Sequence, residues 1–127
     1  MKLLLDTHAL LWLLHEPEKV SASARRHLDA ADEVFVSIAT LWEMANKVAV
    51  GKLHLSTDWP KLLPSLVVSR GAKLLPIEPE DCARLSTLPL HHRDPFDRML
   101  VAQALQRKLA ILSVDKALEP YGVKVVW

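Results

Sequence analysis

The stretch KLLLDTHALLWLLH, residues 2–15, decides the fold class. The apolar run Leu3–Leu5 predicts a short buried strand over Lys2–Leu5, which Asp6 brings to an end. Thr7–His15 follows directly and predicts an apolar helix. A strand that leads at once into a helix is the first half of a β–α unit, and repeated units of this kind are typical of a parallel sheet covered by helices.

Short strands and helices continue to alternate along the rest of the chain. Further strands are expected at Val34–Val36, Leu74–Ile77, Ala110–Ser113 and Lys124–Val126. Further helices are expected at Ser21–Ala31, Ile38–Val50, Asp58–Arg70, Glu78–Leu85 and Pro95–Lys108. The sequence therefore predicts an α/β fold, with a short-stranded, mainly parallel central sheet between layers of helices. In such folds ligands bind at the carboxyl ends of the strands, near a switch in strand order.

Length and composition fit one domain spanning residues 1–127. The formal net charge is +1, so any surface that binds nucleic acid has to be basic locally rather than overall. Cys82 is the single cysteine, which excludes an internal disulfide and a cysteine-based zinc site, and we expect a buried, inert thiol. No apolar run approaches the ~18 residues of a membrane span, and the lack of disulfides predicts a cytoplasmic location.

The stretch DPFDRMLVAQA, residues 94–104, raises a question about one acidic side chain. Asp94 suits the cap of a helix and Pro95 its first position. Helical spacing then places Asp97 on the same face as Val101 and Ala104, a face that a helix normally buries. A carboxylate there is costly unless something pairs with it. Local explanations are an ion pair with one of the neighbouring arginines or a bond to a backbone amide of the first turn.

Three more acids occupy unusual positions. Asp6 ends the first strand, Asp115 follows the strand Ala110–Ser113, and Glu43 lies within an almost wholly apolar helix. Each has a local explanation, since Asp6 and Asp115 could cap helices and Glu43 could lie on an exposed edge. These explanations account poorly for all four acids together. Clustered carboxylates repel one another, and a divalent cation removes that repulsion.

The donor types restrict which cation this is. The chain has no cysteine cluster and no histidine pair at ligand spacing, so the expected site consists of oxygen atoms alone. Hard cations such as Mg²⁺ or Mn²⁺ prefer oxygen ligands and keep several waters. Such ions are expected among the four acids Asp6, Glu43, Asp97 and Asp115.

Four motifs then identify a resemblance that covers nearly the whole chain. They are LLLDTHALLW (3–12), SIATLWEMANKVAVGKL (37–53), HHRDPFDRMLVAQAL (91–105) and LAILSVD (109–115). In this order and spacing they resemble PIN-domain proteins of the VapC branch, the ribonuclease toxins of toxin–antitoxin modules. The resemblance implies a PIN-like α/β/α sandwich and a Mg²⁺- or Mn²⁺-dependent endoribonuclease that inhibits translation. It also implies a homodimer and a VapB-type antitoxin, for which LLWLLHEP (10–17) and the helix around Trp59–Val68 could form the surface.

The resemblance also assigns site residues. Its catalytic acids correspond to Asp6, Glu43, Asp97 and Asp115. In the mechanism that it implies, one or two ions are expected on Asp6, Asp97 and Asp115, with Glu43 and Asp94 as further possible ligands. Thr7, Ser37 and Ser113 match polar positions that support such a site, and Ser113 keeps the hydroxyl of a position that is often Thr in the family. The motif DPFDR carries two acids, and its spacing to the apolar run favours Asp97 as the ligand and Asp94 as the helix cap.

Contacts to RNA have to come from local basic residues near these motifs. We expect them from Lys47, Lys52, Arg93, Arg98 and Lys116, although ordinary solvated charges are an equally good explanation for each alone. His92 is expected in a surface loop, where contact with substrate is possible. Trp12, Trp42 and Trp59 are expected in the core or in an interface rather than as platforms for bases.

Three other functions compete with this interpretation. A receiver-type phosphoacceptor domain requires a pair of acids at the end of the first strand, but Thr7 and His8 follow Asp6 here. A phosphatase with a nucleophilic aspartate requires a D-x-D pattern, which is absent at the same place. A catalytically inactive PIN fold that only binds RNA or protein stays open.

Overall fold

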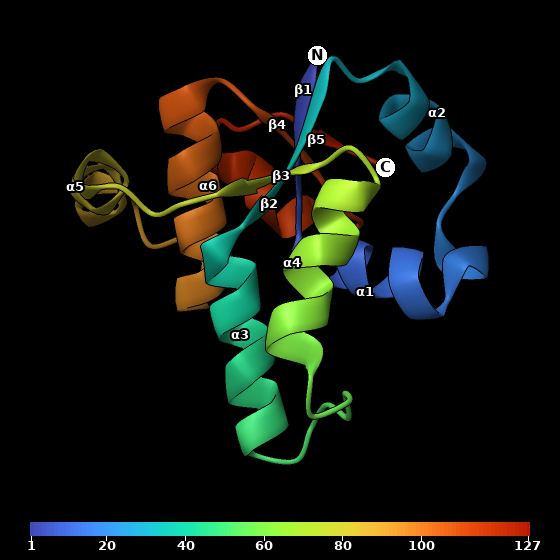
Figure 1. The fold of residues 1–127 in the computed structure, drawn as a ribbon. Coiled ribbons are helices and arrows are strands. Elements are labelled where there is room, and N and C mark those ends of the chain that lie inside the picture. Colours follow the sequence, from blue (N-terminus) through green and yellow to red (C-terminus); the bar gives the residue numbers. More distant parts are fainter.

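The computed structural model describes all residues from 1 to 127, and it forms one sheet with helices on both faces (Figure 1). The strands are β1 (Lys2–Leu5), β2 (Glu33–Ser37), β3 (Lys73–Leu75), β4 (Ala110–Leu112) and β5 (Val125–Val126). They lie in the order β3-β2-β1-β4-β5, and every neighbouring pair is parallel. The predicted α/β fold is confirmed, and the sheet is wholly rather than mainly parallel.

Six α-helices and two 3₁₀ helices connect the strands. They are α1 (Thr7–His15), η1 (Pro17–Lys19), α2 (Ala22–Ala30), α3 (Ile38–Ala49), α4 (Trp59–Ser69), α5 (Pro79–Thr87), α6 (Pro95–Arg107) and η2 (Lys116–Tyr121). Each α-helix and strand expected from the sequence is present, with shifts of a residue or two at the ends. None of these helices combines the length and apolar character needed to cross a bilayer.

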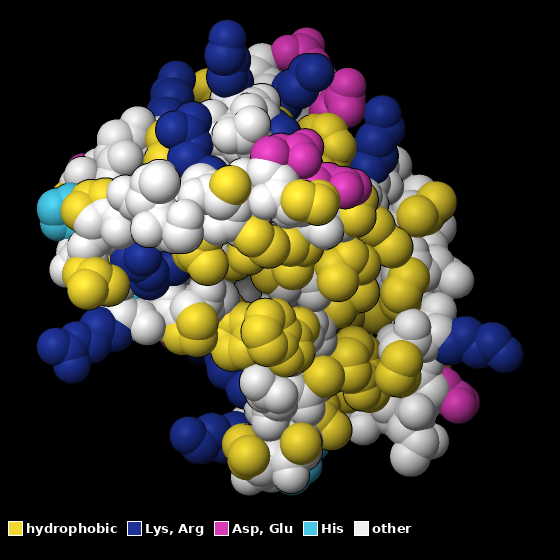
Figure 2. All heavy atoms as spheres, turned by 90° about the vertical axis from the view of Figure 1, so that its left-hand side faces the viewer, with side chains coloured by type: hydrophobic (Ala, Val, Ile, Leu, Met, Phe, Trp, Pro, Cys, Tyr) yellow, Lys and Arg dark blue, Asp and Glu magenta, His cyan; other side chains and the backbone are white.

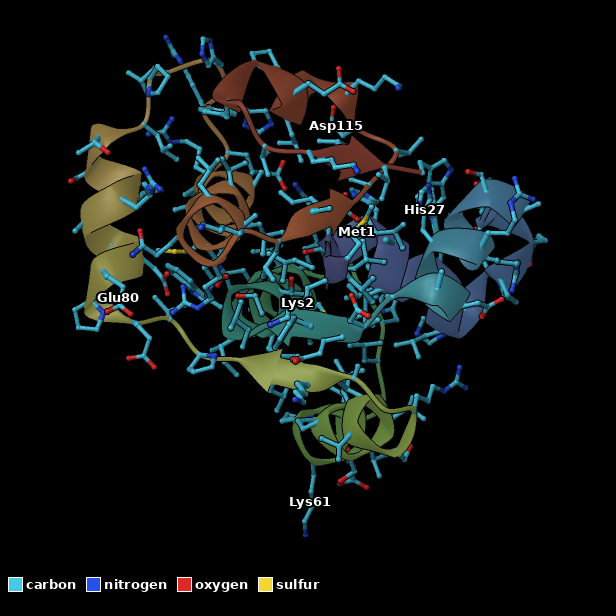
Figure 3. All side chains as sticks on the ribbon, turned by 90° about the horizontal axis from the view of Figure 1, so that it is seen from above. Met1, Lys2, His27, Lys61, Glu80 and Asp115 are labelled. Atoms are coloured by element: carbon cyan, nitrogen blue, oxygen red, sulfur yellow. The ribbon has the colours of Figure 1, made fainter.

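Two apolar clusters fill the space on the two faces of the sheet. One contains Leu4 and Ile111 with the inner side of α6. The other contains Leu5 and Leu112 with residues of α1, α2 and α4. Because neighbouring residues of a strand point to opposite faces, β1 and β4 each supply both clusters. Seen from above, the sheet separates α5 and α6 from α1 and α2 (Figure 3).

Polar caps fix the joints between strands and helices. Asp6 caps α1 by accepting the Ala9 N–H at 2.7 Å, and Ser37 caps α3 by accepting the Ala39 N–H at 3.0 Å. Asp115 in the same way caps η2. The local explanations for Asp6 and Asp115 are therefore correct as far as they go. A cap occupies one carboxylate oxygen, so it leaves the second oxygen of each side chain for other contacts.

One prediction from the sequence is wrong. Cys82 is exposed rather than buried, because α5 turns the neighbouring Asp81 inward and places Cys82 on the outer side. Trp42 also lies outside the core, with 53 % of its surface exposed, and it packs edge-on against Phe96 with ring centroids 4.8 Å apart.

Candidate metal centre

Adjacent strands bring the first and last of the predicted acids together. Leu5 pairs with Leu112, so β1 and β4 end side by side at the point where the strand order changes direction. The Ser113 hydroxyl donates a hydrogen bond to Oδ2 of Asp6. The same hydroxyl oxygen accepts the N–H of Asp115 at 2.9 Å. Ser113 thus links Asp6 and Asp115 at the edge of the sheet where α/β folds bind ligands.

Glu43 reaches the same place from α3 and is held from two sides. Its side chain is buried, and the Thr7 hydroxyl donates to Oε1 at 2.7 Å. Lys47, one turn further along α3, lies 3.0 Å from Oε2. Glu43 is therefore the member of the quartet that has a cationic partner within the chain.

Asp97 projects from the first turn of α6, and neither neighbouring arginine pairs with it. Its Oδ2 lies 3.2 Å from Nε2 of His92. Burial, followed by the charges of the surrounding acids, raises the pKa of Asp97 to about 7. These surrounding acids are Asp94, Glu43, Asp6 and Asp115. The carboxylates of the quartet therefore act on one another electrostatically, although they come from four separate segments.

Burial also raises the pKa of Asp6, although hydrogen bonds from Ser113 and from the Ala9 N–H favour its charged form. The charge of Glu43 adds to the effect of burial. Neither lysine nor arginine forms an ion pair with Asp6, Asp97 or Asp115. The negative charge of these three side chains is therefore not neutralised by the chain itself, and a cation bound from solution would neutralise it.

The donor set fits a hard divalent cation. Asp97, Asp115 and His92 each offer a donor atom within 4.8 Å of the others. Ser113 links Asp6 to Asp115, and the charges of Asp6 and Glu43 act on Asp97. Carboxylate oxygens are the ligands that Mg²⁺ and Mn²⁺ prefer, and few protein ligands suffice because these ions retain waters. Asp94 accepts the N–H groups of Phe96 and Asp97 with one oxygen, which is the predicted role of a helix cap.

Ser37 makes its side-chain contacts away from the acids. Its hydroxyl donates to Oε1 of Gln103 at 2.6 Å, and Nε2 of Gln103 donates to the Pro76 carbonyl at 3.1 Å. These bonds tie the end of β2 to the middle of α6 and to the segment after β3. Ser37 therefore positions α6, whereas Thr7 and Ser113 touch the acids directly.

The five basic residues expected to contact RNA have different surroundings. Lys47 and Lys52 line a hollow of about 320 Å³ together with Glu43, Asp94 and Phe96. Lys116 is exposed at the start of η2, with its Nζ 3.7 Å from Oε1 of Glu119. In Figure 3 the neighbouring Asp115 lies toward the β5 edge of the sheet, whereas α4 lies toward the β3 edge.

Arg98 has a different use from the expected one. Its Nη1 donates to the Pro89 carbonyl at 2.8 Å and to the Tyr121 hydroxyl at 3.1 Å. The side chain therefore fastens the segment before α6 and is directed away from Asp97. Arg93 is exposed in that segment.

His92 was not included among the site residues predicted from the sequence. Its Nδ1 accepts the N–H of Asp94 at 3.0 Å, and its Nε2 reaches Asp97. The position of a histidine two residues before a helix cap only weakly predicts the contact of Nδ1 with the Asp94 N–H. The second contact depends on the path of the whole segment, which periodicity does not determine.

The family model of the PIN domain matches residues 3–124. Ribonuclease VapC22 of Mycobacterium tuberculosis is 26% identical to this chain over 119 residues, which cover 93% of this chain and 90% of that protein.

Solved structures share the fold at low sequence identity. The structure of VapBC2 from Rickettsia felis bound to a DNA fragment from their promoter matches with a TM-score of 0.72 at 9% identity, over 98% of this chain and 97% of that chain. The structure of VapBC-1 from nontypeable Haemophilus influenzae matches with a TM-score of 0.72 at 14% identity, over 98% and 96% of the two chains. Both similarities establish the fold.

Proposed function

The chain belongs to the PIN-domain family, and we propose that it is a metal-dependent endoribonuclease, the toxin of a VapBC-type toxin–antitoxin module that inhibits translation. The observation that carries the proposal is the meeting of Asp6, Glu43, Asp97 and Asp115 at the ends of β1 and β4, with three of the four lacking a cationic partner from lysine or arginine. The relative that is named a ribonuclease supports the same activity.

Each acid has a distinct role in this proposal. Asp6, Asp97 and Asp115 would hold one or two Mg²⁺ or Mn²⁺ ions, with Asp94 able to contribute through a water. Such an ion activates water and stabilises charge on phosphoryl oxygens. Glu43, held by Thr7 and Lys47, orients the attacking water and accepts its proton. The water oxygen bonds to phosphorus as the bond to the 3′-oxygen breaks. The leaving 3′-oxygen takes a proton from solvent, so the products are a 5′-phosphate and a 3′-hydroxyl.

The basic residues near the acids define where RNA would lie. Lys52 shares a hollow with Glu43 and Asp94 and has no ion-pair partner, so it is the residue best placed to contact a backbone phosphate. Arg93 directly precedes the Asp94 cap and is exposed, so it is the second residue placed to contact a backbone phosphate. Single-stranded or looped RNA is the expected substrate, because its bases and backbone are accessible in a groove of this kind.

A VapB-type antitoxin is the proposed protein partner, and an apolar groove supports it. The groove has a volume of about 670 Å³ and lies between the end of α1, α3 and α4. Its lining includes Leu14, Met44, Trp59, Leu62 and Leu66. Leu62 is 58 % exposed, which is unusual for a side chain that serves only the core.

A second copy of the chain is the other proposed partner. Ile38, Trp42 and Val50 recur at helical spacing along α3 and are 37 %, 53 % and 67 % exposed. Figure 2 shows hydrophobic side chains gathered on the face that carries α3 and α5. Sedimentation should give a dimer for the native chain, and Trp42→Glu should shift it to a monomer.

Cleavage of a labelled, partly single-stranded RNA tests the activity. With Mn²⁺ or Mg²⁺ we expect cleavage that EDTA abolishes and that Asp97→Asn lowers by about 10³-fold or more. Asp29→Asn on the exposed side of α2 is the matched control, because it changes the same chemical group away from the site. Cleavage that persists in EDTA or in Asp97→Asn would contradict the proposal. A folded native chain that binds RNA and Mn²⁺ without cutting would instead indicate a binding module.

A further inference from the structure

Hydrogen bonds hold the segment between α5 and α6 in place, and one of them is to His92, the residue that contacts Asp97. Residues 88–94 form neither helix nor strand. Arg98 nevertheless donates to the Pro89 carbonyl, and the Tyr121 hydroxyl donates to the His92 carbonyl at 3.2 Å. Tyr121 is itself 8 % exposed and receives a hydrogen bond from Arg98. The backbone of His92 is thus anchored to η2, and Arg98 of α6 holds Pro89 earlier in the same segment.

The hydrogen bonds of His92 determine which ring nitrogen carries the proton. Nδ1 accepts the N–H of Asp94, so Nδ1 must offer a lone pair. In a neutral ring the proton then lies on Nε2. Nε2 is 3.2 Å from Oδ2 of Asp97, which places an N–H donor against a carboxylate oxygen. One backbone contact therefore sets the direction of the contact to the acid.

We propose that His92 is the positioning residue of the metal centre, which holds Asp97 by donating Nε2–H to Oδ2 and is not itself a ligand. This inference rests on the proposed metal-dependent function. The donated bond occupies one oxygen of Asp97 and leaves the other for a cation. It also opposes the repulsion from the neighbouring acids, which would otherwise favour rotation of the Asp97 side chain away from them.

The alternative role, histidine as a ligand, conflicts with the contact to Asp94. A metal bound to Nε2 requires a lone pair there, so the proton would have to move to Nδ1. Nδ1–H would then face the N–H of Asp94 at 3.0 Å, where two donors would meet and the backbone group would lose its partner. The proximity of Nε2 to Asp97 and Asp115 is better explained by support of the carboxylate.

Two substitutions separate the two contacts of His92. His92→Asn places an amide near Nδ1, so its oxygen can still accept the Asp94 N–H but no donor reaches Asp97. His92→Gln places an amide N–H near Nε2 and restores that donor. For Mn²⁺ binding to the full chain by calorimetry, we expect His92→Asn to weaken affinity about 10-fold and His92→Gln to stay within about 3-fold of the native value. Circular dichroism checks that both variants are folded.

Two spectra examine the same bond without RNA cleavage. Long-range ¹H–¹⁵N correlation in the metal-free protein should find the ring proton of His92 on Nε2. Pulsed electron paramagnetic resonance of the Mn²⁺ complex should find no directly coordinated nitrogen. A proton on Nδ1, a coordinated nitrogen, or an unchanged affinity in His92→Asn would overturn the inference.

Asp97→Asn separates this inference from the proposed function. If Asp97→Asn removes Mn²⁺ binding while His92→Asn leaves it unchanged, the metal centre stands and the role of His92 is refuted. If Asp97→Asn also leaves Mn²⁺ binding unchanged, the metal centre itself is refuted, and the inference about His92 with it.

Discussion

The carboxylates at the two ends of α6 have opposite electrostatic surroundings. Near its C-terminus, Arg107 pairs with Asp81, which is 0 % exposed and also accepts the Glu78 N–H at 2.8 Å. At its N-terminus, Asp97 faces several acids, and its nearest nitrogen is Nε2 of His92, 3.2 Å from Oδ2. The buried acid that serves the fold has its cation within the chain, whereas Asp6, Asp97 and Asp115 of the candidate site are left for a cation from outside.

Removing the paired acid should have the largest effect on stability. Asp81→Asn leaves the Arg107 charge without its partner and weakens the cap of α5, so we expect the free energy of unfolding to fall by about 3 kcal/mol. Urea denaturation followed by circular dichroism measures it. Glu80→Gln is the control, since Glu80 is exposed and 3.8 Å from Arg107, and should cost about 0.5 kcal/mol or less. Equal effects of the two substitutions would contradict the comparison.

The sequence predicted the role of Asp97 but not the ion pair of Asp81. Asp97 was recognised because it occupies an apolar helix face, and Asp6 and Asp115 because they end strands. Asp81 lies in the first turn of α5, where a helix favours acids, and this local position accounts for its bond to the Glu78 N–H. Its pairing with Arg107, 26 residues away, depends on how α5 packs on α6, and no local pattern encodes that packing.

The same distinction applies to the fold. Strands and helices were predictable because their periodicity and caps are local, as for Ser37 before α3 and Asp94 before α6. The outward position of Cys82 was not, because it depends on which side of α5 meets α6. His92 was missed for the same reason, since its place is set by bonds from Tyr121 and by its own bond to the Asp94 N–H.

Adding the cation should stabilise the acidic end of α6 and leave the other end unaffected. At a Mn²⁺ concentration about 100 times the dissociation constant, binding should raise the free energy of unfolding by about 2.7 kcal/mol. Thermal denaturation with and without EDTA measures the increment. Asp81→Asn, although less stable overall, should show the same Mn²⁺-dependent rise in the free energy of unfolding as the native chain. Asp97→Asn should show no such rise. An equal increment in Asp97→Asn would place the ion elsewhere.

Without a cation, neutralising Asp97 should stabilise the protein. In EDTA at pH 8, Asp97→Asn should raise the free energy of unfolding by about 1.5 kcal/mol, a value reduced from the full pKa shift because the side chain is partly exposed. The substitution that abolishes activity is thus expected to strengthen the fold, in contrast to Asp81→Asn. Urea denaturation of both proteins in EDTA measures the difference.

The pH dependence gives the sign of this effect. Because the pKa of Asp97 is raised to about 7 in the folded chain, the folded state binds more protons than the unfolded state between about pH 4 and pH 7. The stability of the native chain should therefore fall, relative to Asp97→Asn, as pH rises through this window. The difference in free energy of unfolding between the two proteins should vanish at about pH 4 and stay constant above about pH 8. A gap that widens toward acid would contradict this assignment.

Glu43 gives the smallest expected effect and refines the comparison. It lies in the acidic cluster, yet it pairs with Lys47 and accepts a hydrogen bond from the Thr7 hydroxyl. In the same way, Asp81 pairs with Arg107 and accepts a backbone N–H. Thr7→Val removes the hydroxyl and should lower the free energy of unfolding by about 1 kcal/mol. Thr7→Ser, which keeps the donor, should cost less. Since this bond belongs to the chain rather than to the cation, the loss should be the same in Mn²⁺ and in EDTA. A loss confined to one of these conditions would mean that Glu43 depends on the ion as Asp97 does.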